Sequence, residues 1–413
     1  MAKLVIIADD FTGALDSGVQ FSARGADVRV LADADFVAMP DADVLVINAE
    51  SRHMTADRAY QTVHSIACRA LSEGAEHIYK KTDSALRGNI GAELSAVMDA
   101  ANETRLPFIP AFPKMNRMTR AGVHYISGVP VAESAFGADP FSPVRESEVK
   151  KLIAMQTARE VTSCAASSGI PDQAGIHVYD AEKEADLDRI ADLLMPEHLR
   201  ISAGCAGFGA ALAHVLGFNG KAGDVGVRSD RLFMVCGSVH PVTVSQIRTG
   251  VENGARRVSL CPRQLMEGWE DGFAAELVEL SEQYNCCVVD TDPEHTDLTA
   301  QYAETHGFPH GCLRQRIAAS LGRLTRELLD GGLRTTLLCS GGDTLYAVVK
   351  ELGIRELIPL CEILPGVILT RFYHHGQSYD VITKSGGFGE ADILRQLINF
   401  LKERKEQSYA ETL

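Results

Sequence analysis

Acidic and basic side chains recur in this sequence just after short apolar runs. Asp9 and Asp10 follow "KLVIIA", and Arg52 lies just beyond "VLVINAE". Lys81 and Asp83 fall within "YKKTDSALRGN". A guanidinium can hold a carboxylate through two parallel hydrogen bonds, an ammonium adds a point charge, and a carboxylate can take a hydroxyl proton as a general base. The set suits a short polyhydroxy acid, which carries one carboxylate and several hydroxyl groups.

The apolar runs have the length and the Val/Ile content of β-strands, and helical segments separate them. "TADRAYQTVHSIACRALSEG" has helical spacing, with Thr55 as the expected N-cap and Gly74 as the stop signal. Strands that alternate with helices predict a mainly parallel sheet. Ligands bind outside the carboxyl ends of the strands in such sheets, so the charged side chains are predicted to gather at one edge.

Each charged residue also has a purely structural interpretation. Asp10 could cap the helix that follows it, and Asp83 could cap the helix that begins near Gly88. Arg52 could pair with Glu50. Because charged groups recur after three strands of one predicted edge, a binding site is favoured for the group as a whole.

Composition bounds the class of protein. The length of 413 residues predicts two domains. The net charge of −15 argues against nucleic acid as a partner, although a local cationic cluster can still bind a small anion. No uncharged apolar stretch reaches the roughly 18 residues of a membrane span, and the N-terminal apolar run is too short for a signal peptide. A cytoplasmic protein without a membrane segment is therefore expected.

The ten cysteines form no C-x-x-C pair, which predicts reduced, mostly buried thiols rather than a disulfide framework or a zinc site. His374 and His375 are adjacent, and the pair is interpreted as an exposed strand end rather than as metal ligands. No metal-binding residue is assigned.

Two segments interrupt the strand–helix pattern. Residues 217–230 are rich in glycine and polar, and they are predicted to link two α/β domains, 1–225 and 229–413, each with a mainly parallel sheet flanked by helices. Residues 113–147 are rich in Gly, Pro and Ser and have little periodicity. They are predicted to form a long loop, either functional or disordered.

Glycine-containing turns follow three predicted strands in the second half: "CGSVHP", "SGGDT" and "KSGGFG". Glycine lets backbone N–H groups approach phosphate oxygens, and the N-terminus of the following helix adds partial positive charge. Lys384 could add a full charge. No P-loop and no dinucleotide-binding fingerprint is present, which disfavours a dehydrogenase and predicts a nucleotide site of unusual type. The steric demands of a tight turn could explain any one of these loops.

The motifs "IADDFTGALDSGVQ", "NAESRH", "YKKTDSALRGNIGAEL", "GSVHPVTVSQI", "SGGDT" and "TKSGGFGE", in this order, resemble those of the four-carbon acid sugar kinase family. The resemblance covers nearly the whole chain and looks closest to the D-threonate kinase branch. Two departures are "NRMT" at residues 116–119, where relatives often carry "GRTT", and Asp343, where some carry Glu.

The resemblance implies a sugar-acid-binding N-terminal domain, a nucleotide-binding C-terminal domain and an active site in the cleft between them. It implies phosphorylation by ATP, with Mg²⁺, of the terminal (4-) hydroxyl of D-threonate or D-erythronate. A 3-oxo-tetronate 4-kinase and a non-catalytic sugar-acid-binding relative are the alternatives. A homodimer is compatible with the sequence.

The resemblance also assigns residues. Those expected to bind the sugar acid are Asp9, Asp10, Arg52, Lys81, Thr82, Asp83 and Ser84, with Asp10 or Asp83 as the general base. Those expected to bind the nucleotide are Ser238, His240, Gly341, Gly342, Asp343, Thr344, Lys384, Gly386 and Gly387.

Overall fold

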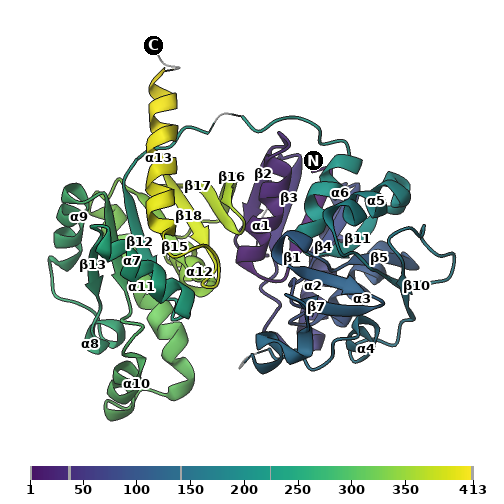
Figure 1. The fold of residues 1–413 in the computed structure, drawn as a ribbon, viewed down its shortest axis with the longest axis horizontal. Helices are drawn as coiled ribbons and strands as arrows, with labels where there is room; N and C mark the ends of the chain where they lie inside the picture. The colour runs from purple at the N-terminus through teal and green to yellow at the C-terminus, as the bar shows by residue number, and fades with distance from the viewer. Residues whose placement is uncertain (1, 36–38, 140–141, 224, 411–413) are drawn as a thin grey trace. The chain divides into compact units, whose positions relative to one another are not determined.

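The chain folds as two α/β units. The structure, a computed structural model, describes residues 2–35, 39–139, 142–223 and 225–410. It divides into Met1–Ala222 and Gly223–Leu413, each with a central sheet and helices on both faces (Figure 1). The predicted fold class, two mainly parallel α/β domains, is confirmed. The assignment of the sugar acid to 1–225 and of the nucleotide to 229–413 stays a prediction, as does an active site between them.

The first unit is built on a parallel sheet whose strands are almost completely buried. Apolar residues on both faces are typical of parallel strands that helices cover on both sides. The spatial order is β2 (Val28–Leu31), β3 (Val44–Asn48), β1 (Leu4–Ala8), β4 (His77–Lys81), β11 (Ile201–Gly204), β5 (Arg105–Ile109), β10 (Gly175–Tyr179) and β9 (Val161–Cys164).

Helices cover this sheet in two groups. Because successive side chains of a strand point to opposite faces, Val5 and Ile7 of β1 join one core while Ile6 faces the other. The helices on the Val5 face are α2 (Ala56–Ser72), α3 (Ile90–Ala101) and α4 (Val149–Ala154). Those on the Ile6 face are α1 (Phe11–Ser22), α5 (Glu184–Leu194) and α6 (Gly209–Val215). Thr55 is the N-cap residue of α2, as the sequence predicts.

The register of the strands aligns their carboxyl ends. Ala8, the last residue of β1, pairs with Asn48 on one side and with Lys81 on the other. The loops after β1, β3 and β4 therefore leave the sheet at the same level. This alignment brings residues that lie more than seventy positions apart in sequence into contact, as for Lys81 and Asp9.

The excursion at residues 113–147, predicted as a long functional or disordered loop, has secondary structure of its own. It contains a small antiparallel sheet, formed by β6 (Arg117–Arg120), β7 (Val123–Ile126) and β8 (Val129–Pro130). Left-handed backbone at Ala121–Gly122 and at Ser127–Gly128 makes both hairpin turns tight. Strands this short leave no readable periodicity. Residues 140–141 of the excursion lie outside the described residues.

The second unit has a mixed sheet. β17 (Val367–His374) runs antiparallel to both of its neighbours, and the other pairings are parallel. The sequence predicts a strand end at His374, where β17 ends, but it predicts no strand at β16 (Glu356–Leu364). The order is β13 (Arg256–Ser259), β14 (Cys286–Asp290), β12 (Leu232–Cys236), β15 (Thr336–Ser340), β18 (Gln377–Lys384), β17 (Val367–His374) and β16 (Glu356–Leu364).

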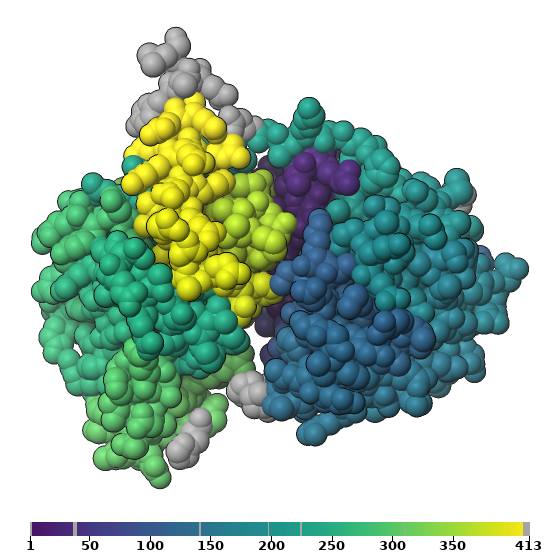
Figure 2. Space-filling view, viewed as in Figure 1, coloured from purple at the N-terminus to yellow at the C-terminus, as the bar shows by residue number. Residues whose placement is uncertain are grey.

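Two layers of helices enclose this sheet. One face packs against α7 (Pro241–Glu252) and α13 (Ile393–Ala410). The remaining helices are α8 (Pro262–Met266), α9 (Phe273–Gln283), α10 (Thr296–Thr305), α11 (Leu313–Asp330) and α12 (Gly342–Glu351). The outer side of α13 is open to solvent in the space-filling view (Figure 2). Among the described residues, no helix is long and apolar enough to span a bilayer.

The cysteines of the described chain are all unpaired thiols. Six of them are buried, which agrees with the prediction of mostly buried thiols, and Cys261 is exposed.

A buried ion pair supports the strand that ends at Lys81. Lys80 Nζ lies 2.9 Å from Glu93 Oε2, and both side chains are essentially inaccessible to solvent. Lys80 Nζ also donates to the Lys81 carbonyl, at 2.7 Å. The pair therefore joins α3 to the end of β4 on the sheet face opposite α1.

We expect single and double replacements of this pair to differ sharply in stability. Glu93→Leu alone leaves a buried, unpaired ammonium and should cost about 3–5 kcal/mol, whereas Lys80→Met with Glu93→Leu should be nearly neutral. Denaturant unfolding of the wild type, both single variants and the double variant measures this difference. Equal destabilisation in the Glu93→Leu and double variants would contradict it.

Candidate active site

Charged side chains from three loops of the first unit form one connected cluster. Arg52 places Nε 2.7 Å from Asp9 Oδ2 and Nη2 2.7 Å from Asp10 Oδ1. Lys81 Nζ lies 2.9 Å from Asp9 Oδ1 and 2.8 Å from Asp10 Oδ1. Asp83 Oδ1 is 3.6 Å from Arg52 Nη2. The structure thus brings together five of the seven predicted sugar-acid residues.

The first turn of α1 is shaped around this cluster. Asp10 is the N-cap of α1, and its Oδ1 accepts a hydrogen bond from Gly13 N at 3.1 Å. A Cβ atom on Gly13 would collide with Lys81 Nζ, so only glycine lets the ammonium reach both aspartates. The capping interpretation and the binding-site interpretation of Asp10 are therefore compatible.

Asp9 and Lys81 are stabilised in their charged forms by their neighbours. Burial disfavours the charged form of Asp9, but the adjacent Arg52 and Lys81 outweigh this effect and hold the pKa of Asp9 well below its usual value. Burial alone would lower the pKa of Lys81, but Asp10 and Asp9 raise it above its usual value. Each charge stabilises its neighbours, so the side chains are positioned before any ligand arrives.

Asp10 differs from the other two carboxylates in its exposure. Its side chain is 21% exposed, against 3% for Asp9 and 7% for Asp83. Oδ1 of Asp10 accepts the hydrogen bond from Gly13 N and also forms both ion pairs, with Arg52 and with Lys81. Within the described residues, Asp10 Oδ2 accepts no hydrogen bond. This oxygen is therefore open to a further hydrogen bond.

Asp83 is held by a second arginine. Arg87 contacts both oxygens of Asp83, with Nε at 2.8 Å and Nη2 at 3.1 Å, and places Nη1 3.2 Å from Asp139. Burial opposes the charge on Asp83, but Arg52 and Arg87 hold its pKa well below its usual value. Arg87 and Asp139 are absent from the predicted site.

The structural alternatives for Asp83 and Arg52 are not realised. Asn89 is the N-cap residue of α3, so Asp83 does not cap that helix. Arg52 pairs with the aspartates, whereas Glu50 accepts a hydrogen bond from Asn48 Nδ2 at 2.9 Å.

Arg117 is a further cation beside this cluster, and it is absent from the predicted site. It comes from β6, and its Nη1 donates to Ser84 Oγ. The Arg87 and Arg117 guanidinium groups lie 5.1 and 5.3 Å from the centre of the Phe136 ring. Burial lowers the pKa of Arg117, and no ion pair in the described chain joins it to a carboxylate. The only signal in the sequence was its place in "NRMT", where the motif departs from that of its relatives.

The last two predicted sugar-acid residues have different surroundings. Thr82 is completely buried, and its hydroxyl donates to the Gly204 carbonyl at 3.3 Å, so its side chain does not reach the cluster opening. Ser84 lies beside Arg117. The Ser84 carbonyl accepts a hydrogen bond from His124 Nε2, at 2.9 Å.

In the second unit, the predicted nucleotide turns after β12, β15 and β18 meet. Thr243 Oγ1 donates to the Gly386 carbonyl at 2.7 Å, and a Cβ atom on Gly386 would collide with Ser238 Oγ. Gly341 lies beside Ser238, at the start of α12. His240 is the N-cap of α7. The N-termini of α7 and α12 therefore open near the same glycine turns, an arrangement that suits a phosphate group.

Lys384 is more enclosed than the prediction assumed. Its side chain is buried, and Nζ donates to the carbonyls of Ser385 and Phe388, at 3.0 and 3.2 Å, and to Thr243 Oγ1 at 3.4 Å. Burial lowers its pKa to about 8. The ammonium thus orders the turn that contains Gly386 and Gly387.

The other predicted nucleotide residues lie in and around the first turn of α12. Gly342 is the first residue of this helix, and Thr344 is buried beside Gly237 and Gly341. Asp343 is half-exposed and lies 2.5 Å from Arg314 Nε.

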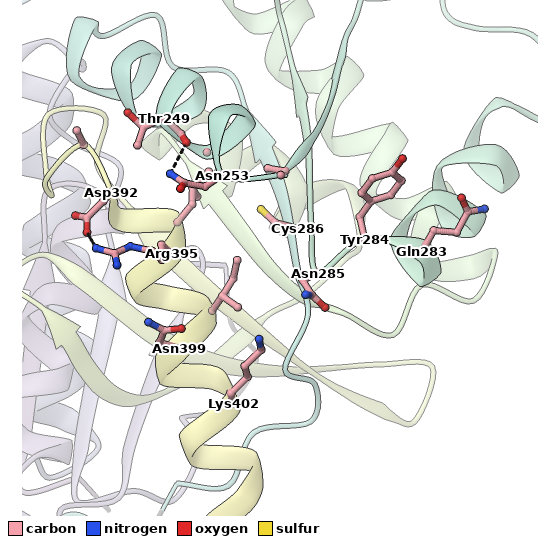
Figure 3. A pocket seen from close by; sticks show the side chains of 16 residues that line it. Thr249, Asn253, Gln283, Tyr284, Asn285, Cys286, Asp392, Arg395, Asn399 and Lys402 are labelled. Atoms are coloured by element: carbon pink, nitrogen blue, oxygen red, sulfur yellow. Dashed lines mark hydrogen bonds and ion pairs between the residues drawn. The ribbon is translucent and has the colours of Figure 1, made fainter.

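A separate cavity of about 380 Å³ lies between α7, α9 and α13 (Figure 3). Asn253, Asn285, Asn399 and Lys402 are among its lining residues. None of the predicted nucleotide residues lines it.

Family models match both units. A sugar-binding N-terminal domain matches residues 4–212, and a nucleotide-binding C-terminal domain matches residues 233–394. A D-threonate kinase of Salmonella typhimurium is 30% identical over 97% of this chain and 99% of its own length. The chain belongs to the four-carbon acid sugar kinase family.

Other members of this family are similarly distant. A D-erythronate kinase of Heliobacterium modesticaldum is 28% identical, over 97% of each chain. A 3-oxo-tetronate kinase of Methylobacterium radiotolerans is 27% identical, over 96% of this chain and 98% of its own. A Haemophilus influenzae protein of known structure shares the fold, with a TM-score of 0.75 at 21% identity over 96% of this chain and all of its own.

His124, which contacts Ser84 at this site, is expected to make the stability of the folded protein depend on pH. Burial lowers its pKa to about 4, against roughly 6.5 for an unfolded histidine, so the unfolded state binds more protons between these values. The stability that neutral His124 contributes should be complete above about pH 6.5 and should fall as the pH falls, by about 2 kcal/mol between pH 7 and pH 5. His124→Gln should lack this loss.

Urea unfolding at both pH values compares the wild type with His124→Gln and with His198→Gln, a matched change at an exposed histidine. An identical pH dependence in the wild type and the His124→Gln variant would show that His124 does not stay neutral.

Proposed function

We propose that the protein is an ATP-dependent kinase that phosphorylates the terminal (4-) hydroxyl of a four-carbon sugar acid, D-threonate or D-erythronate. The observation that supports this most strongly is the pre-organised cluster in the first unit. There Asp10 keeps one open carboxylate oxygen, and Arg117 is a cation that has no carboxylate partner among the described residues. Family membership supports the reaction class, and the names of the relatives support the substrate class.

The substrate carboxylate is proposed to bind at Arg117 and Ser84. Arg52 and Lys81 were expected to hold it, but the aspartates already neutralise both. An additional anion gains most beside a cation that lacks a partner, because burial of such a charge is otherwise unfavourable. Arg52 and Lys81 then hold Asp9 and Asp10 in position through ion pairs.

The nucleotide phosphates are proposed to bind the glycine turns of the second unit. The N-termini of α7 and α12 supply backbone N–H donors and partial positive charge there. Asp343 offers a carboxylate oxygen of the kind that Mg²⁺ prefers, in the half-exposed first turn of α12. The chemistry that Mg²⁺ supplies in such sites is neutralisation of phosphate charge.

Phosphoryl transfer depends mainly on positioning and on charge neutralisation. The reacting atoms must approach to about 3–3.5 Å, so the proposal includes closure of the two units over their substrates. Asp10 Oδ2 accepts the hydrogen bond of the terminal hydroxyl and takes its proton as the oxygen attacks. Both oxygens of Asp83 bind Arg87, so Asp83 helps to orient the substrate and does not accept the proton.

A substrate screen tests the proposed function. ADP release should be measured with ATP and Mg²⁺ on D-threonate, D-erythronate, their L-isomers and 3-oxo-tetronate. We expect turnover on one D-acid, and Asp10→Asn should lower its kcat by roughly 10²–10⁴-fold. Asp192→Asn, at an exposed helical position, is the control. Binding of an acid without ADP release would favour a non-catalytic sugar-acid-binding protein. Turnover on 3-oxo-tetronate alone would show that this acid, rather than D-threonate or D-erythronate, is the substrate.

Replacement of Arg117 tests the position of the substrate carboxylate. Arg117→Met should raise KM for the sugar acid at least about 30-fold, equivalent to about 2 kcal/mol, with KM for ATP nearly unchanged. The KM of Arg117→Lys for the sugar acid should lie between that of the wild type and that of Arg117→Met. Arg120→Met, an exposed change on the same strand, is the control. An unchanged KM for the sugar acid in Arg117→Met would remove Arg117 from the site.

A further inference from the structure

Three metal-binding side chains come together in the second unit, outside both proposed substrate sites. Asp330 is the last residue of α11, His374 is the last residue of β17, and His375 begins the turn to β18. One donor atom from each lies within 4.8 Å of the other two. The exposed strand end that the sequence predicts is therefore only partly correct, since His374 is largely buried beside an aspartate.

The spacing of these atoms fits a metal ion. Asp330 Oδ1 lies 3.3 Å from His374 Nε2 and 3.8 Å from His375 Nε2. Ligand atoms bound tetrahedrally to zinc at about 2.0–2.1 Å lie roughly 3.4 Å apart. The Asp330–His374 distance already matches that geometry, and all three donor atoms lie within 4.8 Å of one another.

The β17–β18 hairpin turn allows the imidazole rings of His374 and His375 to lie on the same side of the chain. Successive residues of an extended strand point to opposite faces. His375 and Gly376 instead have left-handed backbone, with φ of 48° and 76°, and form a two-residue turn between His374 and Gln377. The two rings consequently lie with their centres 4.0 Å apart.

The position of Asp330 also favours a cation. A carboxylate at the C-terminus of a helix faces the negative end of the helix dipole, which is unfavourable. Among the described residues, Arg334 forms no ion pair with Asp330, and its Nη1 donates to Tyr379 Oη and to the Leu333 carbonyl. Within the described chain, the ion-pair partners found for Asp330 are the two histidines.

We propose that Asp330, His374 and His375 form a binding site for a divalent transition-metal ion of the Zn²⁺ type. Two imidazoles and one carboxylate suit such an ion, whereas Mg²⁺ and Ca²⁺ prefer oxygen ligands throughout. Three protein ligands leave one tetrahedral position for water. The ion joins the end of α11 to the β17–β18 hairpin and so stabilises the second unit in proportion to its concentration.

Metal binding by the full chain tests this site. Calorimetric titration with Zn²⁺, and Co²⁺ absorption spectra, should be recorded in a Cys261→Ser background, because Cys261 is an exposed thiol. We expect one ion per chain and a metal-dependent rise in the melting temperature. Asp330→Asn, His374→Gln and His375→Asn should each weaken binding at least about 10-fold. Asparagine tolerates the left-handed backbone at position 375.

The matched control is His295→Asn, which removes a histidine 3.1 Å from Asp292 in the same unit. It should leave metal affinity unchanged. Unchanged affinity in the three site variants, or no saturable binding by the wild type, would overturn the proposal. In the second case the cluster would be an ordinary histidine–aspartate ion pair. Kinase activity with Mg²⁺ is a separate readout, so the metal site and the proposed function can fail independently.

Discussion

The candidate active site depends on one constraint, the mutual neutralisation of Asp9 and Asp10 by Arg52 and Lys81. Each of these groups would be costly to bury alone, and together they are stable because every charge meets an opposite one within about 3 Å. The parallel register of β1, β3 and β4 creates the meeting point. The sheet therefore fixes the position of the charges, and the charges in turn fix the loops that carry them.

Much of this arrangement could be predicted from the sequence. Short Val- and Ile-rich runs alternating with amphipathic segments specify buried parallel strands and their helices, and the switch-point rule then places Asp10, Arg52 and Lys81 at one edge. The meeting of the glycine turns around Ser238 and Gly386 follows from the same rule. These predictions need only the parallel direction of the strands, which the alternation of strands and helices indicates.

Other features depend on contacts that no local pattern reveals. Strands of two to four residues, as in the excursion that carries Arg117, are too short to display alternation. Charge balance is also a property of the folded chain. Only the folded structure reveals that Arg52 and Lys81 are already neutralised, while Arg117 has no carboxylate partner in the part of the chain that the structure describes. Lys384 was likewise expected to face a phosphate, and its amine instead organises its own turn.

The missing side chain at Gly13 has a consequence for how this sequence can change. Any larger residue there would displace the Lys81 ammonium from between the two aspartates. Positions 13 and 81 are therefore not free to vary independently, although 68 positions separate them along the chain. In a mutational library, substitutions at position 13 would survive only alongside a shorter residue at 81, at the expense of the charge that keeps Asp9 and Asp10 together.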